Sequence, residues 1–76
     1  MRLKKRIEVK SLERGMVIID PHNRRGTIET IESQKGWDTF KKEEAIRYRI
    51  GLIIEGQEYL KYFHYISDNK VEAYIL

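Results

Sequence analysis

The alternation of apolar and polar residues from position 46 to 54, IRYRIGLII, constrains the fold of this chain more than any other feature. Successive side chains of a β-strand point to opposite faces of a sheet, whereas the apolar residues of an amphipathic helix recur every three or four positions. The stretch therefore predicts a strand whose buried face is formed by Ile46, Tyr48, Ile50, Leu52 and Ile54. The opposite face of this strand would carry Arg47, Arg49 and Ile53.

Other short segments predict strands because they are rich in branched and aromatic residues and are bounded by turn residues. They are residues 6–10, 16–20, 26–32, 57–66 and 70–76. Gly15 and Gly56 can supply the positive φ that tight turns require, so we expect a turn before residue 16 and a tight hairpin at 55–56. The loop PHNRRG, residues 21–26, combines proline, asparagine and glycine and predicts a hairpin connection.

Two local features are less regular. Ile28 and Ile31 are three residues apart, so both can face the core only if the strand contains a β-bulge. Residues 33–45 form the longest polar stretch, which is either functional or mobile. Asp38 or Thr39 could cap a helix there, and Glu43 precedes Arg47 in the favourable order, so we predict one short helix within residues 38–47.

The fold class that follows is mostly β, in a single domain covering residues 1–76 with a basic N-terminal arm at residues 1–6. Five or six short strands, one long excursion, a tight hairpin and a short final strand resemble a small Src-homology-3-like barrel in layout. The turn before MVIID and the return strand RRGTIETI are also similar to small barrels of the KOW type, over about 20 residues. The resemblance implies a closed barrel, but it assigns no residue roles, because one fold hosts many functions.

Composition excludes several classes of function. The 76 residues include no cysteine, which removes disulfides, thiol catalysis and the usual structural zinc sites. His22 and His64 alone do not make a convincing metal site, and no serine lies in a nucleophile motif. No apolar run has the length of a signal peptide core or a membrane span. We therefore expect a cytoplasmic protein that is not an enzyme and has no cofactor, metal, small-molecule substrate or membrane partner.

Nucleic-acid binding is the function that the charge pattern slightly favours. The formal net charge is +3, and residues 1–10 carry five cations against Glu8 alone. Cations beside aromatic rings can contact phosphates while the rings stack on bases. The predicted nucleic-acid-binding residues are Arg2, Lys4, Lys5, Arg6, Arg24, Arg25, Arg47, Arg49 and Lys61. DNA and RNA are equally compatible with this pattern.

The alternative is a protein-interaction module or a homodimer that uses the aromatic strand 57–66. This strand has apolar groups on both faces, so both can be covered only by a closed barrel, by the excursion at residues 33–45 or by a second subunit. Trp37 would either anchor a partner or fold back as a lid over an open end of the barrel, and the lid is the simpler interpretation. The predicted partner-binding residues are Trp37, Tyr59, Tyr62, Phe63 and Tyr65.

Overall fold

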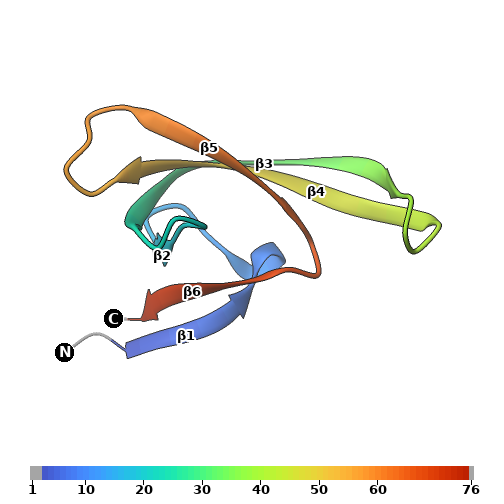
Figure 1. Ribbon diagram of the computed structural model, residues 1–76, viewed down its shortest axis with the longest axis horizontal. Coiled ribbons are helices and arrows are strands. Elements are labelled where there is room, and N and C mark those ends of the chain that lie inside the picture. Colours follow the sequence, from blue (N-terminus) through green and yellow to red (C-terminus); the bar gives the residue numbers. More distant parts are fainter. Residues whose placement is uncertain (1–2, 76) are drawn as a thin grey trace.

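The computed structural model describes residues 3–75 and contains one antiparallel sheet of six strands. In chain order the strands are β1 (Leu3–Glu8), β2 (Val17–Ile19), β3 (Arg25–Asp38), β4 (Glu43–Ile54), β5 (Leu60–Ile66) and β6 (Lys70–Ile75), and a 3-10 turn, η1 (Val9–Ser11), follows β1. The order across the sheet is β1-β6-β2-β3-β4-β5, so β1 and β5 are its two edges. The β class is confirmed, and the sheet is open within the described residues (Figure 1).

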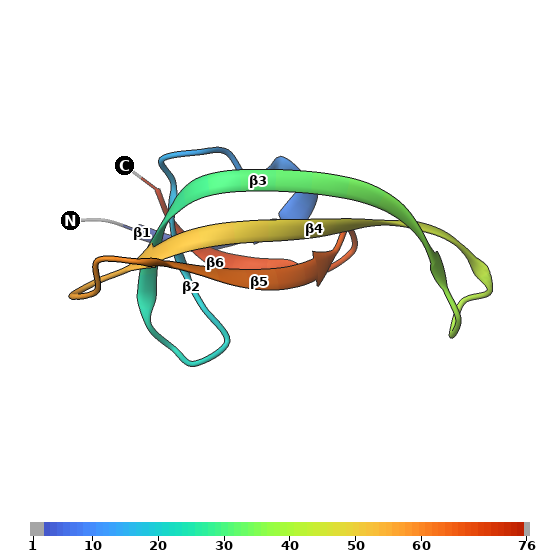
Figure 2. The same ribbon diagram turned by 90° about the horizontal axis from the view of Figure 1, so that it is seen from above.

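The single sheet bends over so that one of its faces becomes the core. Strands β3, β4 and β5 form one layer, β1 and β6 form the other, and β2 runs between the two (Figures 1 and 2). Both layers and the connection after β1 contribute buried side chains, which are Val9, Leu12, Ile18, Ile28, Ile50, Leu52, Ile54, Val71 and Ala73. The period-two prediction for residues 50–54 is therefore confirmed.

Strand β3 contains the β-bulge that is needed for Ile28 and Ile31 to face the same side. The register with β4 shifts between Ile28 and Thr30. Ile28 is consequently buried, and Ile31 packs against the same core although it lies three residues further on. The extra residue therefore lets one strand place both isoleucines on the inner side of the sheet.

Most of the predicted turns form where glycine or asparagine permits a positive φ. Gly15 has φ 89° and Gly56 has φ 85°, while Asn23 has φ 64° in the hairpin connection between β2 and β3. The hairpin at 55–56 is looser than predicted. Gln57 N–H donates to the Ile54 carbonyl at 2.9 Å, but β5 begins only at Leu60. The connection therefore covers residues 55–59.

The prediction of a helix within residues 38–47 is wrong. β3 continues to Asp38, and β4 begins at Glu43 directly opposite it. The Asp38 carboxylate accepts the N–H groups of Phe40 and Lys41, so this residue does cap a turn, but the chain reverses into a strand after it. Asp and Asn side chains favour both helix starts and tight turns, and here the pairing of the flanking strands decides between them.

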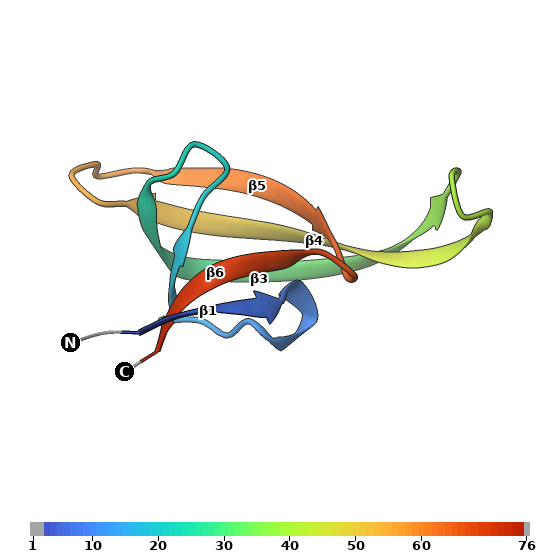
Figure 3. The ribbon, with the colours of Figure 1, turned by 60° about the horizontal axis from the view of Figure 1, so that its bottom comes forward.

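Strands β3 and β4 extend well beyond the core as a hairpin arm, which we define as residues 34–47. The arm projects to the right in Figures 1 to 3, and the principal extents of the molecule are 41 × 26 × 20 Å. No residue of the arm is buried. Trp37 lies near its end, is 54% exposed and is not among the residues packed against the core, so the prediction that this ring folds back as a lid over an open end of the barrel is wrong.

The basic N-terminal segment is part of the sheet. Lys4, Lys5 and Arg6 belong to β1, which pairs with β6 and lies beside it at the lower edge of the molecule in Figure 3. Arg2 lies outside the described residues. Within residues 3–75 there is no helix with the length and apolarity that a membrane crossing requires.

Candidate binding surfaces

The outer face of β3, β4 and β5 carries a group of aromatic and cationic side chains. Because Ile50, Leu52 and Ile54 point into the core, the alternate residues of β4 point outward. Thr30 and Tyr62 flank Gly51 on the neighbouring strands, and Glu32 and His64 flank Arg49. We call the set Tyr62, Arg49, Arg47 and His64 the cation–aromatic platform.

Gly51 explains why the Tyr62 ring lies across the sheet. A Cβ atom at position 51 would lie 2.4 Å from Thr30 Oγ1 and 3.1 Å from Tyr62 Cε1. The ring therefore occupies the space that a side chain at position 51 would fill, a known way to cover glycine in a sheet. Tyr62 nevertheless remains 46% exposed, so part of the ring is accessible to a ligand.

Arg49 on β4 contacts both the Tyr62 ring on β5 and a side chain of β3. Its guanidinium lies 4.5 Å from the centroid of Tyr62, and Nη2 lies 3.0 Å from Glu32 Oε1. Arg47, at the base of the arm, lies two residues along β4 from Arg49 and has no ion pair among the described residues. A depression of about 470 Å³ lies between Gln34, Arg47, Arg49 and His64. The platform therefore offers cations beside a flat ring, although Glu32 offsets one of the charges.

The structure resolves which face of the aromatic strand is buried. Phe63 and Tyr65 point inward and pack against the core, while Tyr62 and His64 point outward. Lys61 lies on the inner side at the edge, with its ammonium 5.7 Å from the ring centroid of Tyr59. Lys61 and Tyr59 are therefore separated from the platform by the sheet itself.

The remaining predicted cations lie elsewhere. Lys4, Lys5 and Arg6 are on β1, which three strands separate from β4 in the sheet order. Lys4 pairs with Glu72 at 3.7 Å. Arg25 lies 3.9 Å from Glu55, and its guanidinium stacks 5.3 Å from the ring centroid of Tyr74. The predicted cations are thus brought together only in pairs or small groups.

Arg24 has a structural role in the connection between β2 and β3. Asp20 is only 4% exposed, and its carboxylate accepts the backbone N–H groups of His22 and Arg24 as well as Arg24 Nε. Burial alone would raise the pKa of Asp20, but these hydrogen bonds and the charge of Arg24 hold that pKa below its ordinary value. These contacts therefore stabilise the hairpin connection, and Arg24 is the one of its two arginines that takes part in them.

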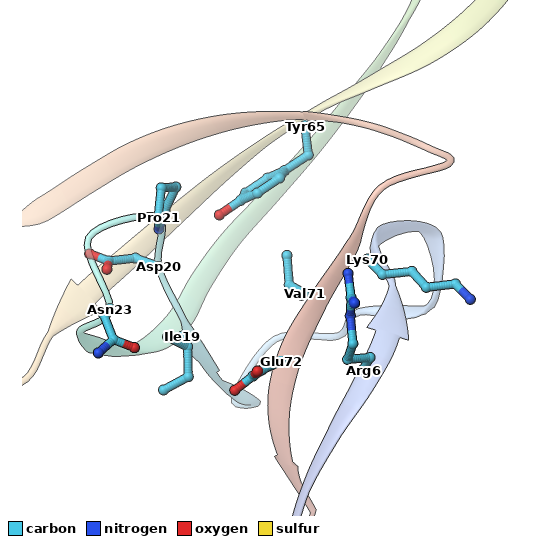
Figure 4. Close-up of a pocket in the computed structure, with 9 residues that line it drawn as sticks. All are labelled: Arg6, Ile19, Asp20, Pro21, Asn23, Tyr65, Lys70, Val71 and Glu72. Atoms are coloured by element: carbon cyan, nitrogen blue, oxygen red, sulfur yellow. The ribbon is translucent and has the colours of Figure 1, made fainter.

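A cavity of about 350 Å³ lies where the two edges of the open sheet approach each other (Figure 4). Tyr65 from β5 covers it, Asp20 and Pro21 border it on one side, and Arg6 and Val71 border it on the other. The Tyr65 hydroxyl is buried and has no hydrogen-bond partner among residues 3–75. Burial raises the pKa of this phenol, and the charge of Asp20 raises it further.

The end of the hairpin arm is the most exposed apolar part of the described chain. Phe40 is 98% exposed and Trp37 is 54% exposed, and Ile46, near the base of the arm, is 40% exposed. Arg47 Nη2 donates to the Trp37 carbonyl at 3.4 Å, and an ion pair joins Lys41 to Asp68 in the turn after β5. That pair raises the pKa of Lys41 and lowers the pKa of Asp68.

Phe40, Glu32 and Gly51 are site residues that the sequence reasoning did not single out. A phenylalanine directly after a turn-forming Asp38 and Thr39, inside the longest polar stretch, is a signal that could have identified Phe40. The signal for Gly51 is a glycine at an outward position of a strand next to an aromatic strand. Glu32 carries no local signal, because its pairing with Arg49 depends on the register of β3 against β4.

Within residues 3–75 no three histidine, aspartate or glutamate side chains gather to form a possible metal site. Comparison with protein families, curated proteins and solved structures gives no match, so the interpretation of these surfaces depends on the geometry of the chain itself.

Proposed function

We propose that this protein is a non-catalytic binding module whose hairpin arm docks into an apolar pocket of a partner protein. The observation that carries the proposal is the exposure of two aromatic rings, Trp37 and Phe40, at the end of a projecting hairpin. Neither ring contributes to the core, so their apolar surface is not explained by folding. Tryptophan is favoured at the centres of protein interfaces, where a few anchors provide most of the binding energy.

The size of the apolar surface supports a protein partner with a concave site. An aromatic side chain buries roughly 150–250 Å² in an interface, which corresponds to about 5 kcal/mol of gross transfer free energy. Association costs roughly 4–15 kcal/mol, so the two rings alone would give only weak binding. A stable complex buries about 800 Å² on each partner, and the flanks of the arm, including Ile46, would provide the rest.

Site-specific photocrosslinking tests this proposal. A benzophenone amino acid at position 40 should give a discrete protein adduct in cells that carry the gene. The matched control places the same group at Glu13, which is exposed on the body of the molecule. The substitution Trp37→Ser should suppress the adduct at position 40, since it removes the second anchor.

The outcome that would contradict the proposal is an equal yield at positions 13 and 40, or an adduct that is insensitive to Trp37→Ser. Sedimentation with anionic and neutral lipid vesicles separates a membrane partner from a protein partner. Vesicle binding that depends on Phe40 would indicate that the arm binds a lipid surface and not a protein pocket. An exposed aromatic ring beside lysines also suits a membrane interface.

A second candidate function is the binding of single-stranded nucleic acid on the cation–aromatic platform. It is favoured by the half-exposed Tyr62 ring with Arg49 stacked against it and Arg47 beside it. A base stacked on an aromatic ring contributes about 1–3 kcal/mol, so Tyr62→Ala should weaken binding by roughly 5- to 150-fold. Fluorescence anisotropy with labelled single-stranded DNA and RNA at about 50 mM salt would measure this.

Two substitutions locate the nucleic-acid site. Glu32→Gln should tighten binding because it releases Arg49 from its carboxylate partner. Arg47→Ala removes one cation from the face of the sheet that carries the platform. Lys61→Ala removes one cation from the opposite face. A larger loss for Arg47→Ala supports the platform. Equal losses, or no binding to the unmodified protein at low salt, would exclude it.

The finer fold description, a small Src-homology-3-like barrel, also remains a proposal. Its support is the pairing of β6 with β2, which returns the end of the chain to the first core strand. Strand β1 then adds outside β6, leaving the barrel open between β1 and β5.

A further inference from the structure

The hairpin arm leaves the sheet as a ribbon of two strands. β5 ends at Ile66, which lies opposite Arg47, so beyond this row β3 and β4 pair only with each other among the described residues. A two-stranded ribbon is only marginally stable by itself, and it twists more strongly than a larger sheet. The pairing of β3 with β4 therefore does not fix the direction in which the arm projects from the body.

One contact joins the far end of the arm to the body. The ammonium of Lys41, in the turn at the end of the arm, pairs with the carboxylate of Asp68, in the turn between β5 and β6. It is the only ion pair between the arm and the rest of residues 3–75. In Figure 1 the end of the arm bends from the level of β3 and β4 towards this second turn.

The charges around this ion pair come from both turns and from the segment after β1. The Asp38 carboxylate accepts the backbone N–H of Lys41, which fixes the start of the lysine side chain. Asp38 and Glu43 act on the Lys41 ammonium, and Lys10 acts on the Asp68 carboxylate. The Lys41 ammonium therefore lies between acidic groups of the arm and an acidic group of the body. Its removal would leave like charges facing each other.

A recess of about 320 Å³ lies between the arm and the same turn, and it is lined by Lys35, Glu44, Ala45, Ile46 and Ser67. Ser67 N–H donates to the Ile46 carbonyl at 2.9 Å at the base of the arm. Trp37 lies opposite Glu44 and therefore on the same side of the arm as Ile46. Bending of the arm about its base would change both the width of this recess and the direction of Trp37.

We propose that Asp68 is a positioning residue of the arm, whose ion pair with Lys41 holds the arm in the one orientation that presents its two aromatic rings for docking. The effect on docking rests on the proposed function of the arm, whereas the orientation itself does not. A binding surface that is already held in its bound conformation loses less entropy on association. The pair is exposed to water, so salt screens it and releases the arm.

Trp37 reports the orientation of the arm in the absence of any partner. It is the only tryptophan in the sequence, and Arg47 Nη2 donates to its carbonyl across the two strands at 3.4 Å. Its fluorescence anisotropy decay separates tumbling of the whole molecule from faster motion of the arm. Asp68→Asn should raise the ratio of released to held arm about 1.5- to 5-fold, the range expected for an exposed ion pair. Lys41→Glu should raise this ratio further, because it adds a negative charge beside Asp68.

Two further variants separate this ion pair from a general effect of surface charge. Glu55→Gln is the matched control, because it breaks the exposed pair with Arg25 inside the body and should leave the decay unchanged. The double variant Lys41→Glu with Asp68→Lys should restore most of the held arm. In about 1 M salt the unmodified protein should resemble Asp68→Asn. An unchanged decay in Asp68→Asn, or no recovery in the double variant, would overturn the proposal.

The photocrosslinked adduct at position 40 separates this proposal from the proposed function. Its yield should fall in Asp68→Asn and recover in the double variant. If no protein adduct forms in any variant, the proposed function fails, and the Trp37 decay alone decides whether the ion pair orients the arm. Equal adduct yields in variants whose Trp37 decay differs would overturn the claim that the held orientation favours docking.

Discussion

The body of the molecule and its hairpin arm are built from the same two strands, yet their side chains are placed very differently. Ile50 and Ile46 lie on the same side of β4, four residues apart, but Ile50 is fully buried and Ile46 is 40% exposed. A second layer, formed by β1 and β6, covers the strands only in the body (Figure 1). Identical residue types therefore stabilise the fold in one region and remain available for contacts in the other.

Substitution of these two isoleucines should give the largest contrast. Ile50→Ala removes fully buried methyl groups from the core and should lower the free energy of unfolding by about 2–5 kcal/mol. Ile46→Ala should change it by less than about 1 kcal/mol, because that side chain retains access to water. Urea unfolding followed by circular dichroism would measure both. A similar loss of unfolding free energy in the two variants would mean that the arm packs against another surface in solution.

A pair of glycines extends the comparison to the backbone. Gly51→Ala introduces a Cβ atom 2.4 Å from Thr30 Oγ1 in the body and should cost about 1–3 kcal/mol. Gly36→Ala on the arm meets only the Arg47 side chain, at 3.2 Å from Nε, and that flexible side chain can move aside. Alanine should be neutral or slightly stabilising there, because glycine weakens a strand.

The control for this pair is Thr30→Ala. It removes the atom that clashes with the new methyl group, and Thr30 Oγ1 is buried without a hydrogen-bond partner among residues 3–75. The double variant should therefore regain most of the stability that Gly51→Ala loses. Thermal unfolding of the four proteins completes the cycle, and strictly additive losses would contradict the steric explanation.

The difference between body and arm also explains what could be predicted from the sequence. Period-two alternation is a local property of the chain, so it predicted the buried positions 50, 52 and 54 of β4. It also showed that Ile28 and Ile31 can share the inner face only through a bulge, which β3 contains. It failed for Ile46, because alternation indicates which side of a strand is apolar and not whether a second layer covers that side. The helix prediction failed because Asp38 favours a turn as readily as a helix start.

The candidate sites depended on information that is not local. The burial of Phe63 and Tyr65 was undecided because strand 57–66 is apolar on both faces. The partners of Arg24 and Arg49 are Asp20 and Glu32, and the Arg49 pair exists only through the register of β3 against β4. A run of basic residues likewise cannot reveal that β1 lies at the opposite edge of the sheet from β5.

Two aspartate-supported turns, one in each region, offer a smaller contrast. Asp20 is buried in the body and has an arginine partner, while Asp38 supports the turn at the end of the arm. Asp20→Asn should lower stability by about 1–2 kcal/mol at pH 7, because it removes the charge that Arg24 and two backbone N–H groups stabilise. Asp38→Asn should cost less than about 0.5 kcal/mol, because asparagine also supports such turns.

The pH dependence identifies the cause of the Asp20 effect. The pKa of Asp20 is lower in the folded protein than its ordinary value near 3.8. The stabilisation is therefore complete above that ordinary value and is lost as the pH falls through the folded pKa. The stability of Asp20→Asn should converge on that of the unmodified protein at acidic pH. A constant difference from pH 7 to pH 2 would contradict a charge-based origin.

The smallest expected effect on folding concerns the most exposed ring. Phe40→Ser should change the free energy of unfolding by no more than about 0.5 kcal/mol, because Phe40 is 98% exposed and contributes nothing to the core. Chemical denaturation measures this change, and the photocrosslinking signal of the arm should fall sharply in the same variant. Loss of binding with unchanged stability would separate the role of the arm from that of the body. A loss of stability above about 1 kcal/mol would instead show that this ring packs against the protein in solution, and the arm would then belong to the folded core.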